Sequence, residues 1–184
     1  FNIKEQILNK GFVPDTDPNF NWHIFWPEKK YQKSNLRVLV AGCGTHEAAI
    51  LSYLNPNHKF IGVDISKNSL SIQKELIKKH NIENLKLICK DFREIQFNLK
   101  FDYIISTGVI HHLQNPASAL QYFEKILKED GIIYLMIYGD KERHSLNHVK
   151  EIFKKIGLKQ DKNSIAIAKE ILDKLNPKHP AKIF

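Results

Sequence analysis

Between residues 36 and 139, short apolar runs alternate with segments in which apolar residues recur at helical spacing. The apolar runs cover residues 38–41, 60–63, 85–90, 101–106 and 132–138. Continuous, β-branched runs of this length are typical of parallel strands buried on both faces. Strands that alternate with helices predict a doubly wound, mainly parallel Rossmann-like α/β sheet in three layers, with helices on both faces.

Three helices are expected between these strands. One begins near Thr45, and a second covers residues 67–80, where Ser66 is a favourable N-cap. A third follows Asn115, which is succeeded by proline at the first helical position. This third helix is expected to place Leu120, Phe123 and Leu127 on one face.

The two ends of the chain follow other patterns. Residues 1–35 are expected to form a cap or lid, with a short helix at 3–8 and an aromatic cluster at 20–26. Residues 36–160 are expected to form the Rossmann-like ligand-binding domain. Residues 161–184 are expected to form a helix and a tail, as the start of a missing region. Two helix faces are predicted near the C-terminus, one with Leu146, Val149, Phe153 and Ile156, the other with Ile165, Ala168, Leu172 and Leu175.

Composition and charge narrow the class of protein. The 184 residues carry a formal net charge of +8, but the lysines are spread over the expected helices, so solvated surfaces are favoured over a nucleic-acid partner. Two cysteines make neither a disulfide framework nor a zinc pattern, which favours a cytoplasmic location. The longest apolar run, 132–138, is too short to span a bilayer, and no membrane association is expected.

The chemistry is concentrated after the first two strands. Gly42 and Gly44 flank Cys43 in a turn that a ligand can approach closely, and Asp64 follows about twenty residues later, where it can accept both ribose hydroxyls. A dinucleotide turn would have glycine where this chain has Glu47, whose charge competes with a pyrophosphate at the helix N-terminus. S-adenosylmethionine has no phosphate, so Glu47 favours that cofactor over a nicotinamide dinucleotide.

Four motifs in order carry a family resemblance. They are Val-Leu-Val-Ala-Gly-Cys-Gly-Thr at 38–45, Gly-Val-Asp-Ile-Ser at 62–66, Cys-Lys-Asp-Phe at 89–92 and Phe-Asp-Tyr-Ile-Ile-Ser-Thr-Gly-Val-Ile-His-His-Leu at 101–113. The chain therefore resembles class I S-adenosylmethionine-dependent methyltransferases, especially the type 11/12 group. That family has seven strands in the order 3-2-1-4-5-7-6, and the last two have no candidate here, so the sheet is expected to be truncated.

The resemblance also implies the cofactor-binding residues. Gly42 and Gly44 would lie under the methionine moiety, Asp64 would hold the ribose, and Asp91 and Phe92 would frame the adenine. Thr107 and Gly108 would line the pocket floor beside the methyl group. The neighbouring positions Ala41, Cys43 and Ile65 complete the expected set. Family members often have glycine where this chain has His46.

The sequence does not identify a catalytic residue. His111 and His112 are candidate general bases, although such histidines more often cap or pack. They are adjacent and expected to point apart, so no metal site is predicted. Cys43 is expected to pack in the turn and not to act as a nucleophile.

The sequence thus predicts an enzyme that methylates a small molecule or a protein side chain. An NAD(P)-dependent oxidoreductase and a non-catalytic binding module with the same fold stay open as alternatives. The sequence does not predict the oligomeric state.

Overall fold

The computed structural model describes residue 3 and residues 22–25, 34–139 and 144–179. Contacts divide the chain into two compact units, Phe1–Ile137 and Tyr138–Phe184. The sequence placed a boundary after residue 160. The structure divides the chain earlier, because both C-terminal helices belong to the second unit.

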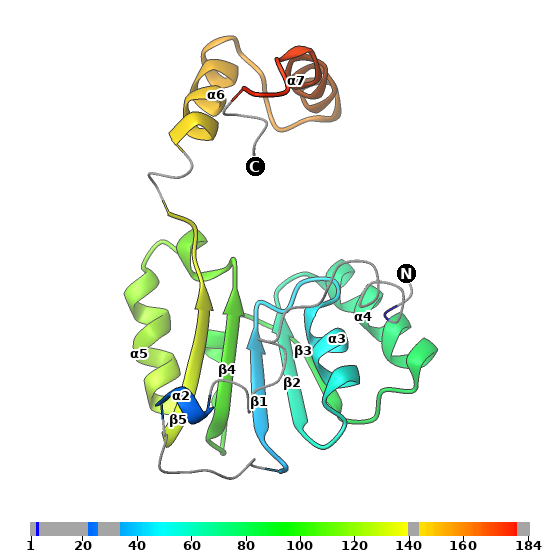
Figure 1. Ribbon diagram of the computed structural model, residues 1–184, viewed down its shortest axis with the longest axis vertical. Coiled ribbons are helices and arrows are strands. Elements are labelled where there is room, and N and C mark those ends of the chain that lie inside the picture. Colours follow the sequence, from blue (N-terminus) through cyan, green and yellow to red (C-terminus); the bar gives the residue numbers. More distant parts are fainter. Residues whose placement is uncertain (1–2, 4–21, 26–33, 140–143, 180–184) are drawn as a thin grey trace. The chain divides into compact units, whose positions relative to one another are not determined.

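The first unit holds a parallel sheet with flanking helices (Figure 1). Its elements are α2 (Trp22–Phe25), β1 (Arg37–Ala41), α3 (Glu47–Leu54), β2 (Lys59–Asp64), α4 (Lys67–His80), β3 (Leu85–Cys89), η2 (Phe92–Glu94), β4 (Phe101–Thr107), η3 (Ile110–His112), α5 (Pro116–Ile126) and β5 (Leu127–Met136). The strand order is β3-β2-β1-β4-β5, and every pair is parallel. The predicted doubly wound sheet is confirmed, and in the described residues it has the first five strands of the family order.

The central strand β1 is buried on both faces because its side chains alternate. Val38 and Val40 belong to a core cluster that includes Leu51 of α3 and Leu70 of α4. Leu39, one residue along, belongs to a second cluster that includes three residues of α5, namely Ala119, Phe123 and Ile126. Helices α3 and α4 therefore cover one face of the sheet and α5 covers the other.

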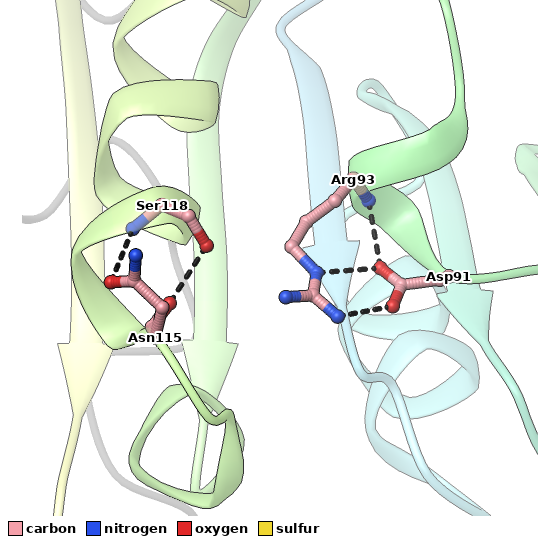
Figure 2. Close-up of polar contacts among 4 residues, drawn as sticks. All are labelled: Asp91, Arg93, Asn115 and Ser118. Atoms are coloured by element: carbon pink, nitrogen blue, oxygen red, sulfur yellow. Dashed lines mark hydrogen bonds and ion pairs between the residues drawn. The ribbon is translucent and has the colours of Figure 1, made fainter.

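Two helices begin where the sequence predicts. Helix α4 covers Lys67–His80, and the side chain of its N-cap Ser66 accepts a hydrogen bond from the Ser69 N–H. Asn115 caps α5 in the same way through the Ser118 N–H, as Figure 2 shows. Each capping side chain lies three residues from the N–H group that it satisfies, so the signal is local, which is why these starts could be predicted.

The face predicted for α5 is not the face that the helix buries. Phe123 is fully buried, but the side chain of Leu120 is 42% exposed, and Leu127 is already the first residue of β5. The observed face is formed by Ala119, Phe123 and Ile126. This face also follows helical spacing, and only the position of the sheet selects it.

Strand β5 and the C-terminal helices also differ from expectation. Strand β5 covers Leu127–Met136 instead of 132–138, because Leu127 already pairs with Phe101 and a register shift follows. The second unit consists of α6 (His144–Lys155) and α7 (Lys162–Lys174). Within it, Ile156 follows the end of α6, and the side chains of Ile156 and Ile165 are exposed.

Some predictions fall outside the described residues. The helix expected at 3–8 and the end of the tail are among them. Of the aromatic cluster at 20–26, only α2 is described, with the side chains of Ile24 and Phe25 exposed. Among the helices of the described ranges, none combines the length and the apolar character needed to cross a bilayer.

Candidate functional site

The turn after β1 is held by main-chain hydrogen bonds to the end of β2. The N–H groups of Gly42 and Cys43 both donate to the Val63 carbonyl, at 2.8 and 3.0 Å. Gly42 and Gly44 have positive φ angles of 76° and 54°, a conformation that glycine adopts without strain. A Cβ atom at Gly42 would lie 2.3 Å from the Val109 side chain, so this glycine also permits the loop after β4 to approach.

Asp64 is the last residue of β2, and its carboxylate ties the turn to the next helix. Oδ2 accepts from the Gly44 N–H and Oδ1 from the Ser66 N–H, both at 2.8 Å. A carboxylate has about four lone-pair sites, so each oxygen keeps capacity for a further donor. The half-buried carboxylate is therefore oriented by the backbone and still able to accept two hydroxyl groups.

A cavity of about 330 Å³ opens beside this carboxylate. It is lined by the carboxyl-end residues Gly42, Val63, Asp64, Ile65, Lys90, Asp91, Phe92, Gly108, Val109, His112 and Leu113. A larger cavity, of about 790 Å³, lies at the amino ends of the strands beside Arg37, Lys59 and Leu85. Parallel α/β sheets bind ligands at the carboxyl ends, where the strand order reverses, so the smaller cavity is the candidate site.

The cavity brings together six of the ten cofactor-binding residues expected from the sequence. They are Gly42, Asp64, Ile65, Asp91, Phe92 and Gly108. The other four, which are Ala41, Cys43, Gly44 and Thr107, are not among its lining residues. Sequence reasoning missed Val63, Lys90, Val109 and Leu113, which reach the cavity from the carboxyl ends of β2, β3 and β4 or from the segments that follow them.

Asp91 and Phe92 each have protein partners at the cavity wall. Arg93 donates to both oxygens of the Asp91 carboxylate, through Nε at 3.0 Å and Nη2 at 2.6 Å (Figure 2). These hydrogen bonds hold the pKa of Asp91 below its usual value. The Phe92 ring is buried and stacks on Phe123, with ring centroids 5.1 Å apart, so only part of it can contact a ligand.

Thr107 and Glu47 meet at the end of β4. Burial raises the pKa of Glu47 to about 6, and a hydrogen bond with the Thr107 side chain opposes this shift. Glu47 is the first residue of α3, so a half-buried carboxylate occupies the helix end that a pyrophosphate would need. Thr107 was expected to line the pocket floor, and its pairing with Glu47 is the feature that sequence reasoning missed.

The two histidines lie in η3, after β4. Their ring centroids are 4.1 Å apart, so the expectation that they point apart is wrong, because the 3₁₀ turn brings adjacent side chains together. Only His112 of the pair lines the cavity. Across the described ranges, no group of three or more His, Cys, Asp or Glu side chains could hold a metal ion.

Cys43 is buried in the turn. Burial, and then the charge of Asp64, raise the pKa of its thiol to about 12. A thiol with this pKa is almost entirely protonated at neutral pH, and the thiolate is the nucleophilic form. The geometry agrees with a packing role for the side chain.

The sheet order, the glycine turn and the acid at the end of β2 define a nucleoside-binding α/β domain. Comparison with known proteins gives the family: residues 32–178 match the family model described as a methyltransferase domain. The chain belongs to this family and is a class I S-adenosylmethionine-dependent methyltransferase domain.

Individual relatives are distant. The chain is 27% identical to an uncharacterized protein of Synechococcus sp., over 86% of this chain and 41% of that protein. It is 25% identical to a malonyl-[acyl-carrier protein] O-methyltransferase of Acetivibrio thermocellus, over 58% of this chain and 37% of that protein. The chain thus spans about 40% of the length of these curated relatives.

A solved structure supports the fold. PKMT2 from Rickettsia typhi in complex with AdoHcy superposes with a TM-score of 0.60 and 23% identity, covering 82% of this chain and 30% of that one. At this level of identity the likeness concerns the fold.

Proposed function

We propose that the protein transfers the methyl group of S-adenosylmethionine to a small molecule or a protein side chain. The observation that carries the proposal is the Asp64 carboxylate, which is fixed by the Gly44 and Ser66 N–H groups and lines the cavity at the carboxyl end of β2. Its remaining acceptor capacity fits the two hydroxyl groups of a ribose.

The other residues of the cavity fit an adenosyl group in the same orientation. Ile65 is 74% exposed beside Asp64, so it offers an apolar surface on which a flat base can pack. Asp91 would accept from the adenine amino group while it retains its bonds to Arg93. Gly42 and Gly44 would lie under the methionine moiety, and Gly108 would line the pocket floor beside the methyl group. Ala41, Cys43 and Thr107 would support them.

The bound cofactor would supply a methyl group attached to a positively charged sulfur, and this sulfur is a good leaving group because it departs as a neutral thioether. The protein then has to orient the acceptor and exclude water, and positioning can provide much of the rate. An acceptor that must lose a proton has His112 at the cavity wall, with His111 beside it. No metal ion is required for this chemistry, and activity is expected to survive dialysis against EDTA.

The similarity to a protein named malonyl-[acyl-carrier protein] O-methyltransferase supports the part of the proposal in which a small chemical group accepts the methyl group. The cysteine usage supports a cytoplasmic site of action, which is part of the proposal. A nucleic-acid acceptor is not favoured.

The deciding experiment measures binding by calorimetry with S-adenosylhomocysteine and with NAD, followed by methyl-donor turnover on a panel of metabolites and proteins. We expect S-adenosylhomocysteine to bind and NAD not to compete, since Glu47 occupies the N-terminus of α3. Competitive NAD binding would favour an oxidoreductase. Cofactor binding with no turnover on any acceptor would favour a non-catalytic module.

A further inference from the structure

Gln73 is a fully buried amide that reaches from α4 to the glycine turn. Its Nε2 group donates to two consecutive carbonyls of the turn, those of Cys43 at 3.0 Å and Gly44 at 2.8 Å. Its Oε1 atom accepts from the Ala49 N–H in α3, at 3.0 Å. Both amide hydrogens are therefore used, and the side chain has no solvent exposure.

The turn and the helix that follows it need these bonds. The first N–H groups of any helix have no partner within that helix. The N-cap residue of α3 is His46, and its side chain makes no capping hydrogen bond. Gln73 satisfies the N–H of Ala49, the third residue of α3, from a different helix and thereby replaces a local cap.

The peptide groups of Gly44 are held from two directions. Its N–H donates to Asp64 Oδ2, and its carbonyl accepts from Gln73. A Cβ atom built at Gly44 would meet no heavy atom of the described residues within 4 Å, so with respect to them the turn is open on that side. The turn is thus anchored by Asp64 and Gln73 from two sides.

We propose that Gln73 is a positioning residue, which fixes the conformation of the glycine turn and thereby sets the affinity for the cofactor. The inference rests on the proposed function, because the turn is assigned there to the methionine moiety. The physical basis is preorganisation: a turn already held in its binding conformation loses less conformational freedom when the ligand binds. A buried amide that only stabilised the fold would change stability without changing affinity.

The test compares Gln73→Met, which keeps the volume and removes all three bonds, with the control Asn84→Ala. Asn84 is a suitable control because its Nδ2 group also donates to backbone carbonyls, those of Ser52, Asn55 and His58. These carbonyls lie in the last turn of α3 and in the loop that follows it, beside the amino ends of the strands. Should Gln73→Met not fold, Gln73→Asn keeps the amide and shortens its reach by one methylene.

Thermal unfolding and S-adenosylhomocysteine calorimetry are measured for each variant. We expect both Gln73→Met and Asn84→Ala to melt at lower temperature, but only the Gln73 variant to bind at least tenfold more weakly. A folded Gln73 variant that binds S-adenosylhomocysteine with native affinity would overturn the proposal.

A second measurement separates this inference from the proposed function. Amide hydrogen exchange at Gly44 and Ala49 is compared in the unliganded native and Gln73 variant proteins. Exchange at both amides is expected to accelerate at least tenfold in the variant and to stay native-like in Asn84→Ala. If the native protein failed to bind S-adenosylhomocysteine, the proposed function would fall, while unchanged exchange would show that Gln73 does not hold the turn.

Discussion

Replacement of Asp64 by alanine is the most direct test of the site. The substitution removes the acceptors for the Gly44 and Ser66 N–H groups and, on our proposal, for both ribose hydroxyls. It leaves the apolar walls of the cavity unchanged. The loss of affinity in a folded variant therefore reports on the carboxylate, both as a partner of the ribose and as an anchor of the glycine turn.

The magnitude follows from the number of hydrogen bonds. A hydrogen bond to a charged group contributes about 1.5–3 kcal/mol. Two such bonds at the lower end amount to about 3 kcal/mol, which corresponds to a roughly hundredfold change in Kd. Water that enters the vacated space will recover part of this energy, so we expect S-adenosylhomocysteine to bind at least tenfold more weakly in calorimetry.

Asp102→Ala is the matched control. Asp102 is a buried carboxylate at the start of β4 that accepts from the Arg37 N–H at 2.9 Å and from Lys128 Nζ at 2.7 Å. Both alanine variants are expected to lose thermal stability, since each leaves a backbone N–H without its carboxylate. Only Asp64→Ala should lose affinity, and a Kd within twofold of the native value in that variant would refute the assignment.

Three further predictions concern stability and reactivity. Asn115→Ala removes the side-chain oxygen that accepts from the Ser118 N–H, so the free energy of unfolding measured in urea should fall by about 1 kcal/mol. No change would show that water replaces the cap. Burial raises the pKa of Glu47 in the folded protein from 4.5 to about 6, so its ionisation destabilises the fold as pH rises through that window. Glu47→Gln should therefore raise the free energy of unfolding by up to about 2 kcal/mol at pH 7 and leave it unchanged at pH 4. Iodoacetamide should label Cys89 in the native protein, and Cys43 only after unfolding, as mass spectrometry can check.

Local signals allowed much of the site to be predicted. The residues of a nucleoside site in this fold follow strand ends, and strand ends are marked by glycine or by an acid after an apolar run. Gly42, Asp64 and Asp91 are of this kind, and all three line the cavity. The start of α4 was predicted to the residue because Ser66 caps an N–H only three residues away.

Other features depend on which surfaces meet in three dimensions. Gln73 lies in a helix pattern as an ordinary polar residue, and its partners Cys43 and Gly44 are about thirty residues away in the chain. Gly62 has no turn signal, yet a Cβ atom there would lie 2.9 Å from Ala48, so it lets α3 approach the sheet. The burial of Phe92 against Phe123 likewise arises from the packing of α5.

By itself the sequence determined the succession of strands and helices along the chain, the glycine turn and the acid at the end of β2. These features depend on residues that are close together in the chain. Only the tertiary structure decided which face of α5 is buried, where β5 begins and which polar groups hold the turn. Those outcomes depend on contacts between residues far apart in sequence, and a periodic pattern is compatible with several such contacts until the sheet has selected one.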